Sequence, residues 1–323
     1  MHPLLIALII ALAVVIAAIL AITVYTYFRV FYNKKRPHVE GGEVYIPRTS
    51  IYEPYRERIL EWVRMTREMG GEVIKIKSDD GLDLYGYYYE YAPGALTEIL
   101  FHGYHGNAER DLSGGVDRCH RLGRNALIVD QRAGGRSGGV TTTFGIKESR
   151  DCLRWVDYAI GRFGKDVKLI LTGVSMGAAT VMIAAGDENL PKNVVSVLAD
   201  CGYTSAKEII SKFISEMHLP PKLIYPFVRL GGMIFGRFDA DKYSPIEAMK
   251  RTRVPIIFIH GDADDFVPTY MSQVLYEACA SEKKKFVKIE GAGHGIAFPA
   301  NEEAYIKALA DFEAECDGFP ITD

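Results

Sequence analysis

The chain has 323 residues, 48% of them hydrophobic and 24% charged, and a formal net charge of −3. These proportions exclude extensive disorder, and the length suits one large α/β domain with a short appendage. The small net charge and the lack of a basic stripe in the folded part argue against nucleic acid as a partner. The cysteines are odd in number and scattered, without C-x-x-C spacing, so we expect reduced thiols rather than a zinc site or disulfides: Cys119, Cys152, Cys201, Cys279 and Cys316.

The N-terminal segment, residues 3–28, contains no charged side chain and consists mostly of Leu, Ile, Ala and Val. At about 1.5 Å rise per residue, a helix of this length crosses a hydrocarbon core of about 30 Å with some tilt. A cleaved signal peptide is the alternative, with Ala17-Ala18 as a small-residue cleavage point. Its apolar region is usually only about 7–15 residues long and follows a basic residue, which is lacking here. We therefore predict one transmembrane anchor over residues 3–32.

Positive charge follows the predicted anchor, whereas only the terminal amine and His2 precede it. The basic residues are Arg29, Lys34, Lys35 and Arg36. The positive-inside rule then places the rest of the chain in the cytoplasm, and an anchor of the opposite sense is the alternative. Aromatic residues at this boundary are expected to form an interfacial belt: Tyr25, Tyr27, Phe28, Phe31 and Tyr32.

Residues 33–50 are polar, with prolines and glycines, and predict a linker. Residues 51–69 carry apolar side chains at helical spacing and predict a helix that packs on the folded domain. We expect this domain to extend over residues 51–323, with the helix as its first element. Beyond residue 72 we expect strands at 72–77, 82–91, 98–102, 126–130, 168–172, 194–200, 255–260 and 285–290. We expect helices near 107–122, 147–162, 176–187, 269–281 and 301–315. This alternation predicts an α/β fold with a mostly parallel eight-stranded sheet covered by helices on both faces.

The most informative motif is the Gly-x-Ser-x-Gly turn at Gly173–Gly177, between a predicted buried strand and a helix start rich in small residues. In this setting the turn holds Ser175 on a strained bend, with its hydroxyl exposed above the sheet. The flanking glycines let the strand and helix backbones pass close to each other. We predict that Ser175 is a nucleophile, which needs an adjacent imidazole to take its proton.

Two later loops supply a carboxylate and a histidine, in the chain order nucleophile, acid, histidine that this kind of turn requires. Residues 261–268 follow the strand at 255–260, and His294 follows the strand at 285–290. Both loops lie at C-terminal strand ends, where the active sites of open α/β sheets gather. His294 stands between two glycines and is the predicted base, and a carboxylate would fix its tautomer and stabilise its charged form.

Three aspartates compete for the role of the acid. We select Asp264, and we expect Asp262 and Asp265 to cap turns or face solvent, as loop aspartates usually do. A metal site formed by the three is the alternative, but no histidine or glutamate at ligand spacing completes it.

Stabilisation of an oxyanion requires two preorganised N–H donors. One is expected to be the backbone N–H of Met176, directly after the nucleophile. The other is assigned to the backbone of Tyr104, in the loop after the strand at 98–102. The Tyr104 ring and His105 either line the pocket or only pack against it, and His102 is interpreted as a structural histidine that braces the loop. The glycine-rich stretch at 130–139 lacks the phosphate-binding spacing and is interpreted as a tight turn.

Together these motifs resemble the α/β-hydrolase superfamily, and most closely its membrane-anchored, serine-aminopeptidase-like and monoacylglycerol-lipase-like branches. The similar stretches, over about residues 72–315, are Phe101-His102-Gly103, Asp130-Gln131-Arg132, Gly173–Gly177, Asp200-Cys201-Gly202-Tyr203, His260–Pro268 and Gly293-His294-Gly295. The resemblance implies the α/β-hydrolase fold, a Ser-His-Asp mechanism with an acyl-enzyme, no cofactor and a variable lid. Its H-G-x-x-D-x-x-V-P motif aligns the acid with Asp264. Gln131-Arg132-Ala133 departs from the commoner arginine-glycine pattern, which leaves the pocket wall open.

The expected substrate depends on the lid, placed at about residues 204–250, which is rich in apolar side chains. Such a segment either packs on the core or forms an acyl pocket next to the membrane. We therefore expect a serine hydrolase that cleaves carboxylic esters of medium or long acyl chains in small or lipid-like substrates. The resemblance implies that it uses no metal and no cofactor. An aminopeptidase or amidase with the same triad is the alternative, and a catalytically inactive, membrane-tethered interaction module is another.

Overall fold

Eight strands form one sheet in the order β1-β2-β4-β3-β5-β6-β7-β8 in the computed structural model, which describes residues 2–34 and 42–319. β1 and β2 pair antiparallel, β2 joins β4 antiparallel, and every later pairing is parallel. The strands are β1 Glu72–Lys77, β2 Asp83–Tyr89, β3 Thr97–Phe101, β4 Asn125–Asp130, β5 Leu169–Val174, β6 Val194–Asp200, β7 Ile256–Gly261 and β8 Lys284–Ile289. The predicted fold class is confirmed. Both ends of each predicted strand lie within two residues of the ends of the corresponding observed strand.

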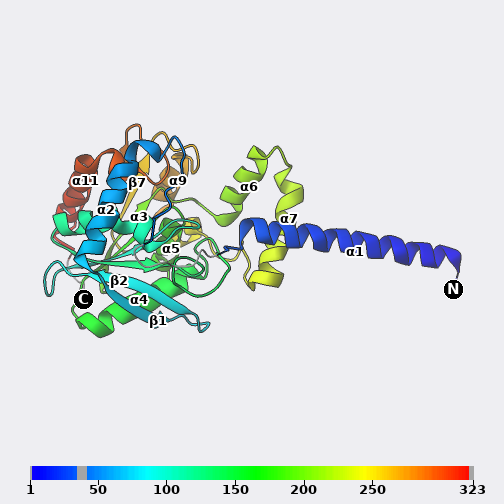
Figure 1. Cartoon of the computed structure of the whole chain (residues 1–323), viewed down its shortest axis with the longest axis horizontal. Coiled ribbons are helices and arrows are strands. Elements are labelled where there is room, and N and C mark those ends of the chain that lie inside the picture. Colours follow the sequence, from blue (N-terminus) through cyan, green and yellow to red (C-terminus); the bar gives the residue numbers. More distant parts are fainter. Residues whose placement is uncertain (1, 35–41, 320–323) are drawn as a thin grey trace.

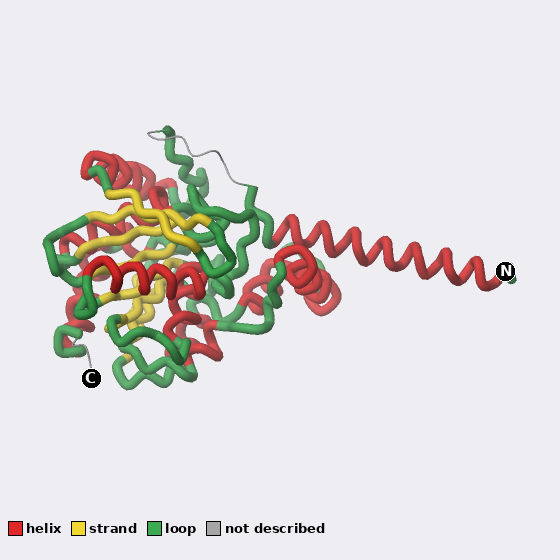
Figure 2. The backbone as a smooth tube through the Cα atoms, turned by 90° about the horizontal axis from the view of Figure 1, so that it is seen from below, coloured by secondary structure: helices red, strands yellow, loops and turns green. Residues whose placement is uncertain are grey.

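Helices cover both faces of the sheet, as the strands (yellow) lying between helices (red) show in Figure 2. The helices of the body are α2 Arg56–Met69, α3 Ala108–Arg121, α4 Glu148–Phe163, α5 Met176–Ala185, α8 Pro245–Met249, α9 Tyr270–Ala278, α10 Ala297–Ala300 and α11 Glu302–Glu315. Successive side chains of a strand point to opposite faces. Accordingly, Ile256 and Phe258 of β7 share a core with α4, α5 and α9, whereas Ile257 and Ile259 share another with α2 and α11.

The helix predicted over residues 51–69 begins later than expected. A short 3-10 turn, η1 (Glu53–Tyr55), precedes α2, which starts at Arg56. Pro54 explains the difference, because proline has no N–H to donate and disfavours the helical conformation of the residue before it. Trp62 and Val63 of α2 are buried, so this helix packs on the body.

The N-terminal helix, α1 (Pro3–Val30), projects from the body as the longest helix (Figure 1). Its 28 residues include a window of mean hydropathy 3.4, none of which is buried, so it is a candidate membrane span or signal sequence. Its last turns behave differently, because Tyr27 and Phe31 are buried among the side chains of the body. The expected aromatic belt is therefore wrong for these two residues, while Tyr25 and Phe28 are exposed.

Beyond α1 the chain stays in contact with the body as far as the structure describes it. The backbone N–H of Asn33 donates to the Val140 carbonyl, and the N–H of Thr142 donates to the Phe31 carbonyl, both at 2.8 Å. Of the four basic residues behind the anchor, Arg29 and Lys34 are described, whereas Lys35 and Arg36 lie outside the described residues, as does the linker from 35 to 41.

Residues 204–250 contain α6 (Ala206–Glu216), α7 (Pro221–Gly231), the π-helical turn η2 (Gly232–Gly236) and α8. Ser205 starts α6 by accepting a hydrogen bond from the Glu208 N–H, and prolines start α7 and α8. α8 packs against α5 in the body, whereas α7 packs against the end of α1 and α6 packs against α7 (Figure 1). Two separate parts of the chain therefore meet at the base of the projecting helix.

Candidate active site

The turn between β5 and α5 places Ser175 in a conformation that few residues with a side chain adopt. Its φ is 57° and its ψ is −113°, outside the allowed regions for ordinary residues. A methyl group on Gly173 would overlap the Gly177 backbone, and one on Gly177 would overlap the Phe101 carbonyl oxygen. The Ser175 N–H donates to the Asp200 carbonyl at 2.8 Å and holds the turn against β6. The glycines of the motif are thus required by close backbone packing.

Three side chains form one hydrogen-bonded series at the C-terminal ends of the strands. His294 Nε2 lies 2.8 Å from Ser175 Oγ, and His294 Nδ1 lies 2.7 Å from Asp264 Oδ2. Because the Asp264 carboxylate accepts a hydrogen bond from His294 Nδ1–H, His294 Nε2 is left as the acceptor that faces the serine hydroxyl. Ser175 is 7% exposed and Asp264 5% exposed, so water has little access to the series. The structure thus brings together the three residues that the motifs single out.

Asp264 is held by two further sets of donors. Its Oδ1 accepts from the N–H groups of Phe266 and Val267 at 2.9 and 2.8 Å. Its Oδ2 also accepts from His260 Nε2 at 3.1 Å. Burial raises the pKa of Asp264, but the hydrogen bonds from His260 and His294 outweigh it and lower the pKa to about 2. The carboxylate is therefore ionised at neutral pH.

His260 is fully buried at the end of β7 and holds the same carboxylate oxygen of Asp264, Oδ2, that His294 contacts. Its Nε2–H also donates to the Val267 carbonyl at 2.8 Å, and its Nδ1 accepts from the Ser272 hydroxyl at 2.7 Å. These partners fix the tautomer in which Nε2 carries the proton. The motif alignment contains His260, but its role as a clamp on Asp264 is visible only from the packing.

The other two aspartates of the acid loop are exposed and face elsewhere. Asp262 Oδ1 accepts from the Gly291 N–H at 2.7 Å and so caps the neighbouring loop. Asp265 offers its backbone carbonyl to Lys212 Nζ at 2.9 Å. Of the three aspartates, Asp264 is the one with a hydrogen bond to His294.

The loop after β3 passes directly beside the nucleophile. A methyl group on Gly103 would lie 3.6 Å from Ser175 Cβ. Met176, on the other side, is the first residue of α5, and the first N–H groups of a helix have no partner within it. The backbone of Gly103, directly before Tyr104, and that of Met176 therefore flank Ser175.

His102 and Gln131 brace this loop. His102 Nδ1–H donates to the Gly103 carbonyl at 2.7 Å, because its Nε2 accepts from the Gln131 N–H at 3.0 Å. The Gln131 amide group donates to the His102 carbonyl at 2.6 Å and accepts from the Thr180 hydroxyl at 2.9 Å. Gln131 thus ties β4 to the loop after β3 and to α5, a role that the sequence pattern does not show.

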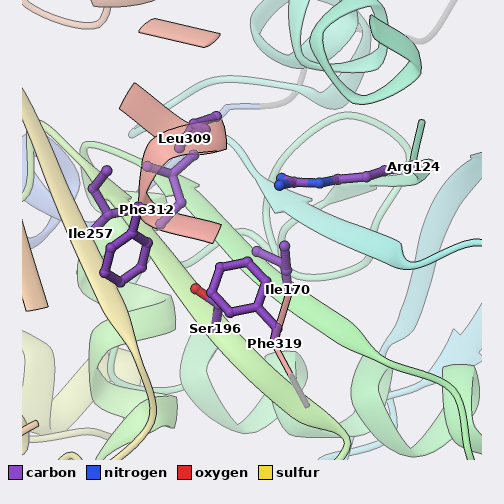
Figure 3. Close-up of a pocket in the computed structure, with 8 residues that line it drawn as sticks. Arg124, Ile170, Ser196, Ile257, Leu309, Phe312 and Phe319 are labelled. Atoms are coloured by element: carbon purple, nitrogen blue, oxygen red, sulfur yellow. The ribbon is translucent and has the colours of Figure 1, made fainter. Parts of the chain in front are cut away.

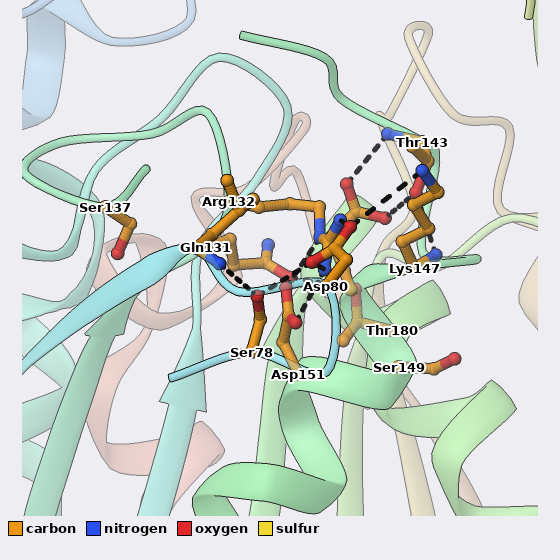
Figure 4. A network of polar contacts seen from close by, with 12 residues as sticks. Ser78, Asp80, Gln131, Arg132, Ser137, Thr143, Lys147, Ser149, Asp151 and Thr180 are labelled. Atoms are coloured by element: carbon orange, nitrogen blue, oxygen red, sulfur yellow. Dashed lines mark hydrogen bonds and ion pairs between the residues drawn. The ribbon is translucent and has the colours of Figure 1, made fainter. Parts of the chain in front are cut away.

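Arg132 extends this support to α4 and to the turn between β1 and β2 (Figure 4). Its guanidinium donates to both carboxylate oxygens of Asp151 at 2.7 Å and to Asp80 at 2.9 Å. The fork of N–H groups on arginine fits a carboxylate with two parallel hydrogen bonds. Gln131-Arg132, where the resemblance expects arginine-glycine, is therefore a structural brace behind the site.

Apolar side chains surround the series on the side that faces α1. Met176 belongs to a buried cluster with Phe144, Tyr203, Ile209 and Val267. The same cluster contains Tyr27 and Phe31 from the end of α1. An apolar wall thus runs from the residue next to Ser175 to the base of the projecting helix.

Tyr104 connects the loop beside Ser175 to α1. Its hydroxyl donates to the Val30 carbonyl at 2.8 Å, and its ring stacks on His105 at 3.8 Å between centroids. The Tyr104 ring also lies 5.3 Å from Phe144. The Tyr104 ring packs against the apolar wall, whereas His105 is exposed.

α6 covers the histidine of the series through one aromatic contact. The Phe266 ring lies 4.8 Å from the His294 ring, and Phe213 of α6 lies 4.6 Å from Phe266. Lys212, beside Phe213, donates to the Asp265 carbonyl and fastens the helix to the acid loop. The segment at 204–250 therefore lies over the site at α6.

A small cavity lies at the other end of the strands (Figure 3). It is lined by Ile170, Ser196 and Ile257 near the start of their strands, and by Phe312 and Leu309 of α11. Ser175, Asp264 and His294 follow the C-terminal ends of the same sheet. The cavity is thus separate from the hydrogen-bonded series.

One cluster of potential metal ligands is found among the described residues, and it overlaps the series. Cys201 lies near Asp264 and His294, with ligand atoms within 4.8 Å of one another. Burial raises the pKa of the Cys201 thiol well above its usual range, so the group is a neutral thiol rather than the thiolate that metals bind. Asp264 and His294 are already engaged with each other, which makes this group a poor fit for a metal.

Comparison with known proteins supports the interpretation of the fold. Residues 169–304 match the family model described as serine hydrolase (FSH1), a range that contains Ser175, Asp264 and His294 but covers less than half of the chain. The protein YqkD of Bacillus subtilis is 28% identical over 73% of this chain and 77% of its own length. The protein bem46 of Schizosaccharomyces pombe is 26% identical over 68% of each chain.

Solved structures are similar over most of the chain. An esterase from Pyrococcus furiosus superposes with a TM-score of 0.65 and 19% identity, covering 88% of this chain and 98% of that chain. Est1E from Butyrivibrio proteoclasticus, with ferulic acid bound, superposes with a TM-score of 0.57 and 21% identity, covering 75% and 98%. At this identity the likeness shows the fold. The chain therefore has the α/β-hydrolase fold, and its similarities support a place in the α/β-hydrolase superfamily, with residues 169–304 resembling serine hydrolases.

Proposed function

We propose that this protein is a serine hydrolase that cleaves carboxylic esters through Ser175, His294 and Asp264. The observation that carries the proposal is the continuous series from Ser175 Oγ through His294 to Asp264, with both distances below 3 Å. The strained turn at Ser175 and the match of residues 169–304 to serine hydrolases support the same chemistry. The esterases among the similar structures agree with it at the level of the fold.

In the proposed reaction, Ser175 Oγ attacks the ester carbonyl while His294 Nε2 takes the hydroxyl proton. Asp264 stabilises the imidazolium that forms and holds its Nδ1–H. His294 then gives the proton to the leaving alcohol, which produces an acyl-enzyme on Ser175. Water enters and attacks the acyl carbonyl as it loses a proton to His294. His294 then returns that proton to Ser175 Oγ as the carboxylic acid leaves, which restores the serine.

The oxyanion of each tetrahedral intermediate would bind to the backbone N–H groups of Met176 and Tyr104. Support comes from Met176 standing at the start of α5, where the helix dipole also favours negative charge. The contact between Gly103 and Ser175 supports the position of the Tyr104 amide. His102 and Gln131 would preorganise that amide through their hydrogen bonds.

The substrate is proposed to carry a medium or long acyl chain, as in the monoacylglycerol-lipase-like branch. The apolar wall from Met176 to Phe144 and Phe31 supports this, because an acyl chain that enters beside the nucleophile would meet hydrocarbon side chains there. Aminopeptidase or amidase activity with the same triad is the competing outcome.

A substrate panel tests the proposal. We expect kcat/KM for p-nitrophenyl esters to rise from acetate towards longer acyl chains, because each buried CH2 contributes up to about 0.8 kcal/mol. Aminoacyl anilides should be turned over far more slowly than any of these esters. Measured kcat/KM values that are highest for acetate would refute the acyl pocket, and a preference for anilides would replace the esterase with a peptidase.

We also propose that α1 anchors the protein in a membrane, with the catalytic body in the cytoplasm. Its length and its exposed apolar window support the span, and Arg29 and Lys34 behind it support the orientation. The buried thiols fit a reducing compartment, because all five cysteines are free.

The membrane anchor has its own test. The full chain should remain in the membrane fraction after an alkaline carbonate wash, and deletion of residues 1–22 should release a folded body. The deletion ends there because Tyr27 and Phe31 belong to the buried cluster of the body. Protease added to intact spheroplasts should leave the body undigested. Digestion without lysis would show that the body faces outward.

A further inference from the structure

The outer face of α7 and η2 exposes large apolar side chains. The exposed fractions are 66% for Leu223, 49% for Met233, 47% for Ile234 and 42% for Phe235. Phe227 lies one helical turn after Leu223 and continues the face along α7. We call Leu223, Phe227, Met233, Ile234 and Phe235 the α7 surface. Burial of such a patch against a partner is favoured, because its apolar area would leave water.

The α7 surface lies beside the end of the projecting helix. A methyl group on Gly231 would be 3.0 Å from the Thr23 carbonyl oxygen and 3.0 Å from Tyr27 Cβ, so the two helices touch through their backbones. The Phe235 ring lies 5.3 Å from the Tyr27 ring. α7 runs across α1 rather than along it (Figure 1). The apolar surfaces of α1 and α7 are therefore continuous.

The position of the α7 crossing along α1 sets the depth of α7 in a bilayer that α1 spans. Residues 3–22, which precede it, have a helical length of about 30 Å at about 1.5 Å per residue, which equals the hydrocarbon thickness of a bilayer. The crossing at Thr23 and Tyr27 thus falls at the boundary between hydrocarbon and headgroups. Tyr25 and Phe28 are exposed on α1 at the same level, where aromatic side chains are favoured.

The charges around the α7 surface suit a lipid headgroup layer. Residues 221–236 contain no acidic side chain. Lys222 and Arg237, next to the two ends of this segment, are exposed. An apolar face flanked by cations, on a helix lying across the membrane normal, is the pattern of an interfacial helix.

We propose that α7 and η2 lie in the headgroup boundary of the same bilayer that α1 crosses, with the α7 surface turned towards the acyl chains. The protein would then hold the membrane by two elements, a span and an interfacial helix. Because α6 continues from α7 to the Phe213 and Phe266 cover over His294, the site lies against the bilayer surface. The inference rests on the proposed anchor and is independent of the hydrolytic reaction.

The experiment uses single cysteines introduced into the full chain, because the five native thiols are buried and label poorly. Leu223→Cys and Ile234→Cys place an environment-sensitive fluorophore on the α7 surface. Val14→Cys, in the middle of α1, reports the span, and Val73→Cys, which is 50% exposed on β1, reports an apolar site of the body. Each labelled protein is reconstituted in phosphatidylcholine and phosphatidylglycerol vesicles that carry a nitroxide quencher either near the headgroup or near the acyl-chain end. Fluorophosphonate labelling of each sample measures the serine chemistry separately.

We expect the fluorophores at 223 and 234 to be quenched more by the shallow than by the deep nitroxide, since interfacial helices lie about 5–10 Å into the boundary. The fluorophore at 14 should be quenched more by the deep one, and that at 73 by neither. Quenching at 14 with none at 223 and 234 would overturn the interfacial helix while keeping the anchor. No quenching at 14 would overturn both. Blue-shifted but unquenched emission at 223 and 234 would assign the surface to a protein partner and likewise overturn the proposal.

Discussion

Replacement of Ser175 by alanine is expected to lower kcat for p-nitrophenyl butyrate by about 10^6-fold. The substitution removes the Oγ that lies 2.8 Å from His294 Nε2, so that no acyl-enzyme forms. KM should change little, because the apolar wall that would hold the acyl chain is untouched. Steady-state kinetics on the purified full chain measure the effect.

The fold of the Ser175→Ala variant is expected to be intact. Alanine retains the Cβ at φ 57°, and the N–H bond to Asp200 does not involve the side chain. Circular dichroism and thermal unfolding of the two proteins provide the control. Parental turnover by the variant would remove Ser175 from the mechanism.

The second large effect is expected for Asp264→Asn, which should lower kcat by about 10^4-fold. An asparagine amide can present N–H groups to His294 Nδ1, which favours the tautomer whose proton sits on Nε2. That tautomer cannot accept the Ser175 proton. The substitution also removes the charge that His260 faces in the buried site.

Asp262→Asn and Asp265→Asn are the matched controls, because they make the same chemical change in the same loop. Asp262 accepts from the Gly291 N–H, and the side chain of Asp265 is exposed, so we expect kcat to stay within a few-fold of the parent. A larger loss for Asp262→Asn than for Asp264→Asn would reassign the acid.

The lowered pKa of Asp264 has a consequence for stability at low pH. A carboxyl whose pKa is about 2 in the folded state, below its unfolded value of about 3.9, stabilises the fold above the unfolded pKa. That contribution is lost as the pH falls through the folded pKa. At any pH well above 4, Asp264 is therefore the ionised partner that the proposed mechanism needs.

Much of the fold could be predicted because the local sequence patterns agree with the overall arrangement of strands and helices. The central strands are short apolar runs bounded by turns, and the glycines around Ser175 mark a backbone approach that only glycine permits. Motif order placed the candidate residues after three different strands. Parallel strand ends meet at one edge of a sheet, so residues far apart in the sequence were expected together.

The remaining features depend on packing that a linear pattern does not encode. The apolar run of α1 and the aromatic residues at its end give no sign that Tyr27 and Phe31 face protein rather than lipid. His260 and Gln131 are polar residues whose roles follow from partners far along the chain. The start of α2 at Arg56 depends on Pro54, which interrupts a helical spacing that begins at residue 51.

The central claim is that Ser175 is the residue that forms a covalent acyl intermediate. The most direct measurement is reaction of the full chain with a fluorophosphonate, followed by digestion and mass spectrometry of the modified peptide. We predict one adduct, on Ser175, which forms much more slowly in the Asp264→Asn variant and is lost in the Ser175→Ala variant. An unmodified Ser175 peptide in a protein that still hydrolyses p-nitrophenyl butyrate would contradict the account.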